Sequence, residues 1–130
     1  MQRPAATAGM RHIALFVNDF DAAERFYVDL LGMRVEWRPD ADNVYLTSGN
    51  DNLALHRSER DVDCTATLDH IGFILKRPDD VDAWYEFLLA HGVEMKSTPH
   101  THRDGARSFY CVGPQDVIVQ MIFHPPLADS

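Results

Sequence analysis

The stretch MRHIALFV (residues 10–17), followed by NDFDAAERFYVDLLG (18–32), recurs in altered form as LDHIGFIL (68–75), followed by KRPDDVDAWYEFLLAHG (76–92). In each copy a histidine, His12 or His70, stands third in the short apolar run. The histidines are 70 − 12 = 58 residues apart, and the apolar positions of the following helical pattern recur at the same offset. This shared register indicates an internal duplication.

Each copy predicts a βαβββ module, because a strand with period two gives way to a helix with period 3.6 and then to three short strands. The first module covers residues 10–58, with a helix at 19–31 that Gly32 ends and further strands at 33–38, 44–47 and 52–58. The second covers residues 68–124, with a helix at 78–90 that Gly92 ends and further strands at 93–97, 107–112 and 117–123. Residues 59–67 read as a polar linker, and residues 1–9 as a flexible tail before a single domain at 10–130.

Strand parity predicts where the two histidines point. Each predicted helix has one apolar stripe and must pack on one face of a sheet, which leaves the other face open. Alternate residues of a strand share a face, so His12 lies opposite Ile13 and Leu15, whose aliphatic side chains suit the face that carries the helix. The same parity places His70, and Gln120 in the last strand, on the open face.

Composition excludes several classes of partner. The chain has 130 residues and a formal net charge of −8, with 12 basic residues that form no cluster. This balance disfavours nucleic acid and anionic membranes, and no apolar run is long enough to cross a bilayer. Residues 1–9 also lack the apolar centre of a secretory signal, so we expect a cytoplasmic protein with a small-molecule partner. Cys64 and Cys111 have neither metal-like nor redox-like spacing and are expected to be reduced structural thiols.

The repeated histidine unit, together with ERFYVDLLGMRV (24–35) and SFYCVGPQDVIVQMI (108–122), resembles the vicinal oxygen chelate superfamily. That superfamily includes glyoxalase I, extradiol dioxygenases, methylmalonyl-CoA epimerase and bleomycin resistance proteins. The resemblance covers nearly all of residues 10–123. It implies an α+β fold in which two βαβββ modules form an eight-stranded, cup-shaped mixed sheet with the helices on the outer face. It also implies a divalent metal ion (Fe, Ni, Zn or Mn) inside the cup and a homodimer.

The superfamily's metal positions fall on His12, Ala54, His70 and Gln120. The last position is usually Glu in the superfamily, and glyoxalase-like members have a carboxylate or amide where this chain has Ala54. The metal ligands implied here are therefore His12, His70 and Gln120. Such a neutral set offsets less of the charge of a divalent ion than a set with carboxylates does.

Further site residues lie at inward positions of the same strands. His56 shares the parity of Ala54 and is a candidate general base or substitute ligand. Tyr110 resembles the tyrosine that extradiol dioxygenases place ten residues before their metal-binding Glu, and is a candidate catalytic and ligand-binding residue. The other candidate ligand-binding residues are Phe16 and Asn52 in the cup lining and Arg103 in the loop HTHRDGAR (100–107), which could close over the cup as a lid.

Two functions stay open on this basis. The first is a metal-dependent enzyme that chelates two adjacent oxygens of a small substrate, of lyase, isomerase or dioxygenase type. The second is a metal-free binding or resistance protein of the bleomycin-resistance type, which the missing carboxylates favour. Departures from the superfamily's patterns count against two subclasses: the acid–base histidine of the dioxygenases would fall near Asn50 or Asp51, and the glutathione-anchoring residues of glyoxalase I would fall on Phe16 and Ser58.

Overall fold

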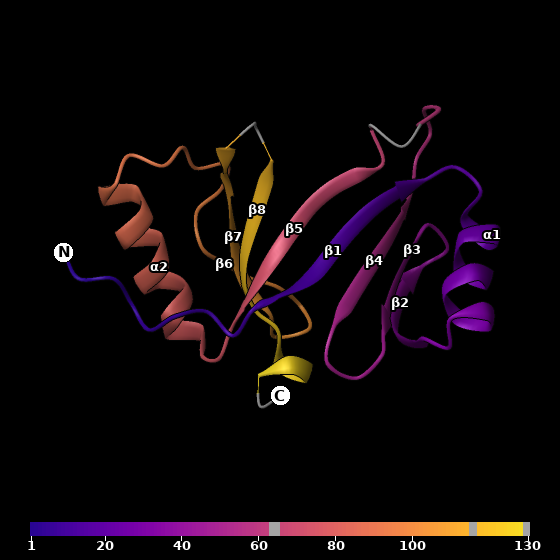
Figure 1. Ribbon diagram of the computed structural model, residues 1–130, viewed down its shortest axis with the longest axis horizontal. Coiled ribbons are helices and arrows are strands. Elements are labelled where there is room, and N and C mark those ends of the chain that lie inside the picture. Colours follow the sequence, from indigo (N-terminus) through magenta and orange to yellow (C-terminus); the bar gives the residue numbers. More distant parts are fainter. Residues whose placement is uncertain (63–65, 115–116, 129–130) are drawn as a thin grey trace. The chain divides into compact units, whose positions relative to one another are not determined.

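The computed structural model describes residues 1–62, 66–114 and 117–128. The chain divides into two compact units, which follow the two modules of the duplication. The first-module unit is His12–His70, and the second-module unit consists of Met1–Arg11 and Ile71–Ser130. Figure 1 shows the helices and strands that are named below. No helix of the described residues is both long and apolar enough to span a membrane.

The first-module unit is a four-stranded mixed sheet with one helical segment. Its elements are β1 (Met10–Val17), α1 (Phe20–Arg25), a π-helical turn (Phe26–Leu30), β2 (Arg34–Asp40), β3 (Asn43–Thr47) and β4 (Asn52–Arg57). The strand order is β2-β3-β4-β1, in which β1 pairs in parallel with β4 and the other neighbours are antiparallel. Phe20 of α1 packs on Leu46 and Leu55 in the buried core, and Leu15 packs against the same cluster. The opposite face of β1, which carries His12 and Ala14, is therefore the face without the helix.

The second-module unit repeats this plan. Its elements are β5 (Leu68–Leu75, which enters the unit at Ile71), α2 (Pro78–Ala90), β6 (His100–Thr101), β7 (Arg107–Val112), β8 (Ile118–Phe123) and a 3-10 turn (Pro125–Leu127). The strand order is β5-β8-β7-β6, with β5 and β8 parallel. Trp84 of α2 packs with Phe109 and Met121 in the core of this unit. The α+β class and the two βαβββ modules, with four of the eight described strands in each, are confirmed.

The duplication has the expected register at its start and loses it later. Strand β5 and helix α2 begin 58 residues after β1 and α1, since 68 − 10 = 58 and 78 − 20 = 58. The last strands, β4 and β8, are 118 − 52 = 66 residues apart. The second module therefore contains eight additional residues between the start of its helix and the start of its last strand.

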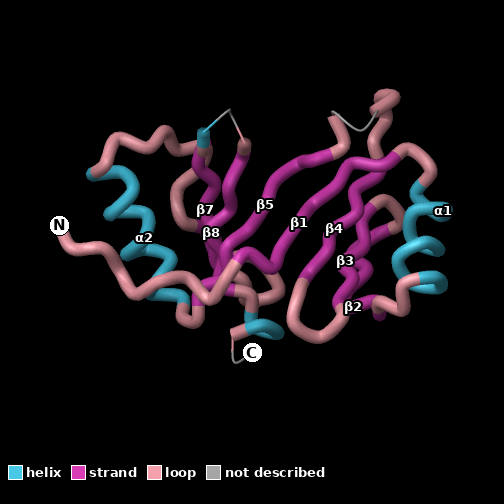
Figure 2. The backbone as a smooth tube through the Cα atoms, viewed as in Figure 1, coloured by secondary structure: helices cyan, strands magenta, loops and turns pink. Residues whose placement is uncertain are grey.

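One predicted strand is wrong. Residues 93–97 form no strand, and only a single bridge joins Met95 to Cys111 (Figure 2). The ladder breaks there because the backbone N–H groups of Lys96 and Ser97 both donate to the same carbonyl oxygen, that of Tyr110. The short strand β6, which the sequence did not suggest, pairs with β7 further along, where His100 lies opposite Ser108.

The predicted helix at residues 19–31 is present but changes its geometry half-way. The N–H of Leu31 donates to the carbonyl of Phe26, five residues earlier, which is the π-helical spacing. A π turn holds more residues than an α turn, so the apolar stripe shifts, and Leu30 and Leu31 are exposed although the sequence pattern placed them on the buried face. Gly32 ends the helix at φ +83°, a backbone conformation that glycine adopts without strain.

The N-terminal residues form hydrogen bonds with elements of the second-module unit. The indole N–H of Trp84 donates to the carbonyl of Ala5, and the N–H of Ala8 donates to the carbonyl of Ile74. Residues 5–8 are thus hydrogen-bonded to α2 and β5.

Cys111 is a buried free thiol, and burial raises its pKa. Cys64 lies outside the described residues.

Candidate functional site

The two repeated histidines meet in the first-module unit. His12 on β1 and His70 on β5 are each only 5% exposed, and their Nε2 atoms are 2.7 Å apart. The ring centroids are separated by 4.8 Å. The pair forms because each histidine is third in its strand and points to the face opposite the helix, as strand parity predicted.

Hydrogen bonds at the outer ring nitrogens fix the protonation of both rings. The Nδ1 of His12 lies 2.7 Å from the Oδ1 of Asn52, whose Nδ2 donates to the Oε1 of Glu36 at 3.1 Å. A carboxylate only accepts, so the Asn52 amide presents its oxygen to His12, and Nδ1 of His12 must carry the proton. The Nδ1 of His70 lies 3.1 Å from the Oδ2 of Asp69 and must likewise donate. Donation from His70 lowers the pKa of Asp69.

In neutral imidazoles this arrangement leaves both Nε2 atoms as lone pairs that face one another. At 2.7 Å two such lone pairs repel unless a proton or a cation lies with them. Histidines that bind metal ions have this pattern, in which the outer N–H donates to a carboxylate or amide and the inner nitrogen is the ligand. The donor chemistry therefore fits a divalent metal ion. Among residues 1–62, 66–114 and 117–128, no three His, Cys, Asp or Glu side chains gather in a metal-binding arrangement.

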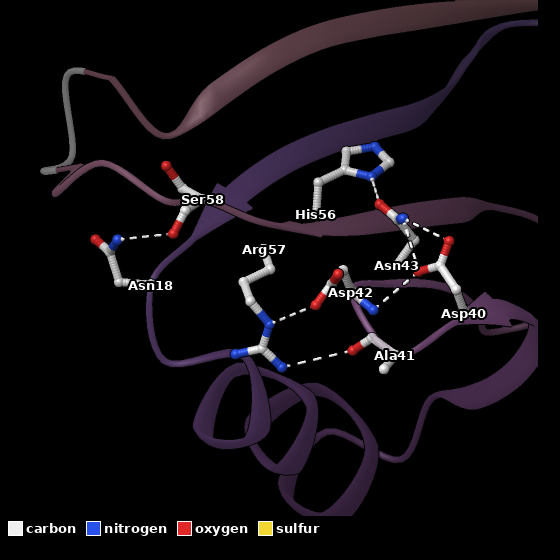
Figure 3. Close-up of polar contacts among 8 residues, drawn as sticks. All are labelled: Asn18, Asp40, Ala41, Asp42, Asn43, His56, Arg57 and Ser58. Carbon is white, nitrogen blue, oxygen red and sulfur yellow. Dashed lines mark hydrogen bonds and ion pairs between the residues drawn. The ribbon is translucent and has the colours of Figure 1, made fainter.

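His56 on β4 lies on the same face of the same unit. Its Nδ1 is 2.6 Å from the Oδ1 of Asn43, and Asn43 in turn donates to Asp40 (Figure 3). Burial is the main cause that lowers the pKa of His56, and nearby His70 lowers it further, whereas Asp69 and Asp40 act in the opposite direction. A lowered pKa favours the neutral form of His56, which is the form that a general base needs.

Small and aromatic side chains lie between these histidines. Ala14 and Ala54 are paired neighbours on β1 and β4, and each is at most 1% exposed. Tyr45 lies opposite Ala54 in the register of β3 and β4, and its ring stacks on Trp37 at 5.4 Å. Phe16, a predicted ligand-binding residue, has its ring 6.1 Å from that of His56. This face therefore combines a floor of small residues with an aromatic edge.

The second-module unit contains the remaining predicted residues. Gln120 on β8 is 4% exposed and pairs directly with Tyr110 on β7. Its Nε2 donates to the Oγ of Ser108 at 3.0 Å, and its buried Oε1 accepts no hydrogen bond within the part of the chain that is described. A buried carbonyl oxygen without a donor costs stability, so this atom is suited to receive a ligand.

The loop between β6 and β7 contributes one residue to this network and leaves another in solvent. The Nε2 of His102 is 3.0 Å from the Oγ of Ser108, and burial with neighbouring His100 lowers the pKa of His102. Arg103, predicted to bind ligand, is exposed next to it. Further along β8, Ile122 packs with Leu127 of the C-terminal turn in a buried cluster.

Comparison with protein families shows to which superfamily the chain belongs. The model of the Glyoxalase/Bleomycin resistance protein/Dioxygenase superfamily matches residues 9–121. The chain belongs to this superfamily. A curated relative, a manganese-dependent 2,3-dihydroxybiphenyl 1,2-dioxygenase from Geobacillus genomosp. 3, is 31% identical over 96 residues. The match covers 71% of this chain and 29% of that relative, so the chain spans under a third of the dioxygenase's length.

Solved structures of the superfamily show the same fold. The Mn(II)-bound glyoxalase from Novosphingobium aromaticivorans aligns with a TM-score of 0.74 and 22% identity over 90% of this chain and 39% of its own. The 2,3-dioxygenase LapB from Pseudomonas sp. KL28 aligns with a TM-score of 0.78 and 15% identity over 92% and 43%. A methylmalonyl-CoA epimerase from Streptomyces coelicolor aligns with a TM-score of 0.70 and 20% identity over 92% and 96%.

Sequence reasoning missed the side chains that orient the histidines. Asp69 carries a visible signal, because it directly precedes a superfamily metal position. Glu36 carries none, since it meets Asn52 only through strand pairing. Asp40 and Asn43 are close in the sequence, but their link to His56 depends on the pairing of β3 with β4. Asn52 is a predicted ligand-binding residue, and its Oδ1 also accepts a hydrogen bond from His12.

Proposed function

We propose that the chain is a divalent-metal-dependent enzyme of the superfamily that acts on a small molecule with two adjacent oxygen atoms. The observation that supports this is the pair of converging Nε2 atoms of His12 and His70, each with its outer nitrogen already donating. Manganese in two relatives makes Mn²⁺ the first ion to test among Mn, Fe, Ni and Zn. A bound ion supplies Lewis acidity that stabilises negative charge on substrate oxygens.

The residues of the first-module unit divide the work. His12 and His70 hold the ion through Nε2, while Asn52 and Asp69 fix their rings. Phe16, Tyr45 and Trp37 provide the apolar edge against which a substrate packs. His56, which is half-buried and whose pKa is lowered by that burial, is the proposed base.

We also propose roles for the predicted residues of the second-module unit. The buried Oε1 of Gln120, which has no partner among the described residues, is proposed as a neutral oxygen ligand. Ser108 holds the amide in place by accepting a hydrogen bond from its Nε2. Tyr110, its partner across the strands, is proposed to donate a hydrogen bond to substrate. Arg103 is exposed and is proposed to bind an anionic or polar group of the ligand from the loop.

Metal retention tests the proposal. The purified chain is loaded with Mn²⁺, desalted and analysed for bound metal, with the paramagnetic resonance of Mn²⁺ as a second readout. We expect about one bound ion per chain, lost in His12→Ala and His70→Ala but retained in His91→Ala, which removes an exposed histidine that bonds the carbonyl of Phe87. Absence of bound metal, or retention unchanged in His70→Ala, would refute the proposal. Turnover is then assayed with substrates of the three named classes of relative.

The second candidate is a metal-free binding protein, favoured by Ala54 and by the amide of Gln120 where carboxylates are usual. In that case a proton shared between the Nε2 atoms of His12 and His70 relieves their repulsion. Ligand binding that a chelator leaves unchanged supports this candidate, and binding abolished by chelator supports the enzyme.

We further propose that the chain is a cytoplasmic homodimer. The apolar side chains of Phe26, Leu30 and Leu31 are 46%, 74% and 59% exposed, which a second copy could cover. Sedimentation equilibrium measures the oligomeric state directly, and a monomer at micromolar concentration contradicts the homodimer.

A further inference from the structure

A carboxylate, an amide and an imidazole form a hydrogen-bonded chain at the end of the β2–β3 hairpin. The Nδ2 of Asn43 donates to both carboxylate oxygens of Asp40, at 2.8 and 3.1 Å. The Oδ1 of Asn43 lies 2.6 Å from the Nδ1 of His56. Figure 3 shows the three side chains in this order, with the second ring nitrogen of His56 turned away from Asn43.

The direction of these bonds follows from the carboxylate. Asp40 also accepts the backbone N–H of Asp42, and these bonds lower its pKa, so it is an acceptor at neutral pH. An acceptor takes the NH₂ end of the Asn43 amide, which leaves the amide oxygen facing His56. His56 must therefore donate through Nδ1, and in the neutral ring the lone pair is on Nε2. This nitrogen has no hydrogen-bond partner among the described side chains and backbone groups.

The hairpin that carries Asp40 and Asn43 is fixed to the strand of His56. The backbone N–H of Arg57 donates to the carbonyl of Asp42, and its Nε donates to the Asp42 carboxylate at 2.9 Å. Asn43 and His56 are also direct partners in the register of β3 and β4. The hydrogen-bonded series of Asp40, Asn43 and His56 is thus preorganised by main-chain pairing.

The same construction occurs a second time at the proposed metal ligands. Glu36, Asn52 and His12 form a carboxylate–amide–imidazole chain with the same donor order. At His12 the resulting lone pair faces the Nε2 of His70, whereas the Nε2 of His56 has no hydrogen-bond partner among the described residues. The two hydrogen-bonded series therefore leave the Nε2 atoms of two imidazoles in different surroundings.

We propose that Asp40 and Asn43 are positioning residues that hold His56 in the Nδ1–H tautomer, so that its Nε2 serves as the proton acceptor of the reaction. The base role rests on the function proposed above; the tautomer does not. In the step, Nε2 forms an N–H bond as a C–H or O–H bond of the substrate breaks. The electron pair stays on the substrate as an enolate or alkoxide, and His56 becomes an imidazolium that donates through both nitrogens.

Nitrogen-15 NMR of the histidine rings tests this directly, because the two tautomers give distinct patterns of long-range couplings. At a pH above its titration we expect wild-type His56 to hold its proton on Nδ1 with about a tenfold excess, the ratio that corresponds to ~1.4 kcal/mol. A proton mainly on Nε2 overturns the proposal without the need for any variant.

Paired substitutions in the hairpin separate positioning from general structure. Asp40→Ala and Asn43→Leu should lose the tenfold excess. Asp42→Ala, which removes a carboxylate of the same hairpin that bonds Arg57 instead, should keep it. Asn43→Asp should also keep the tenfold excess. It should raise the pKa of His56, because a carboxylate then faces Nδ1 directly and adds to the effects of Asp40 and Asp69, which raise this pKa, against that of His70, which lowers it. An unchanged tautomer in both Asp40→Ala and Asn43→Leu overturns the proposal.

The outcome is distinguishable from failure of the metal proposal. The tautomer is measured on the metal-free chain, and metal retention should be the same in Asn43→Leu as in wild type. Loss of metal with an intact tautomer ratio counts only against the metal site. Retained metal with the Nε2–H tautomer counts only against the Asp40–Asn43 role.

Discussion

An imidazole binds a cation or accepts a proton only through the nitrogen that lacks a hydrogen. In this chain the choice is made one or two hydrogen bonds away from the ring, by Asn52 and Glu36 for His12 and by Asp69 for His70. Each acceptor removes one tautomer and directs the lone pair to the other nitrogen. The tautomers of these histidines are therefore set by acceptors at their outer nitrogens.

Removing the acceptor of His12 should weaken metal binding without removing a ligand. In Asn52→Leu the Nδ1–H of His12 loses its partner and the ring can adopt the other tautomer. We expect metal affinity to fall about 10–100-fold, as is typical for such outer contacts. Titration of Mn²⁺ by calorimetry measures the change. Asn18→Leu, which removes an amide that bonds the carbonyls of Ser58 and Arg60, should leave the affinity intact.

Burial of His56 should make the folded state less stable in acid. Because its pKa is lowered on folding, the unfolded chain binds more protons once the pH falls below about 6.5, the ordinary value for His. The unfolding free energy should then decrease as the pH falls from there toward the folded pKa. In His56→Gln the decrease between pH 7 and pH 5 should be smaller, as measured by urea denaturation. An identical decrease in His56→Gln and wild type would contradict this.

At the scale of elements, each helix packs on one face of its own sheet, and the histidines lie on the face without a helix. Helix α1 is short, and it starts at a side-chain cap in which the Oδ1 of Asp19 accepts the N–H of Ala22 at 3.0 Å. Helix α2 has proline at its first position and no side-chain cap. Proline has no N–H, so the start of α2 has one donor fewer to satisfy, whereas the start of α1 depends on Asp19.

Loss of this cap should have a measurable cost. Asp19→Ala leaves the N–H of Ala22 without its side-chain acceptor, and the unfolding free energy should fall by about 1 kcal/mol. Asp21→Ala, in the first turn but without the capping bond, should cost less. Equilibrium denaturation in urea compares the two, and equal losses would mean that charge near the helix start matters more than the cap.

At the scale of the whole molecule, a bound ion is linked to folding. His12 and His70 are 58 residues apart in the sequence, so only the folded chain presents both Nε2 atoms together. A ligand that binds only the folded state stabilises it by about 2.7 kcal/mol at 100 times its Kd. We expect the Tm to rise by on the order of 10 °C with saturating Mn²⁺ and to return after chelation. His12→Ala and His70→Ala should show no such rise.

Local signals in the sequence were sufficient for most of the fold. The 58-residue offset places β5 and α2, glycine at positive φ ends the first helix at Gly32, and strand parity places His12 and His70 on the open face. The strand expected at 93–97 fails because an apolar pattern does not show that two N–H groups will share one carbonyl. The π turn was not predicted for a similar reason, because the hydrophobic period does not encode the spacing of hydrogen bonds.

By itself, the sequence determined the two modules, their helices and the identity of the histidines that face away from them, because period and duplication are local properties of the chain. The acceptor of His70 is its sequence neighbour Asp69, but only the tertiary structure decided how His12 and His56 are protonated. Glu36 reaches Asn52, and Asp40 and Asn43 reach His56, through the register of neighbouring strands. Register depends on pairing between distant segments, and a shift of one residue would turn every acceptor to the opposite face.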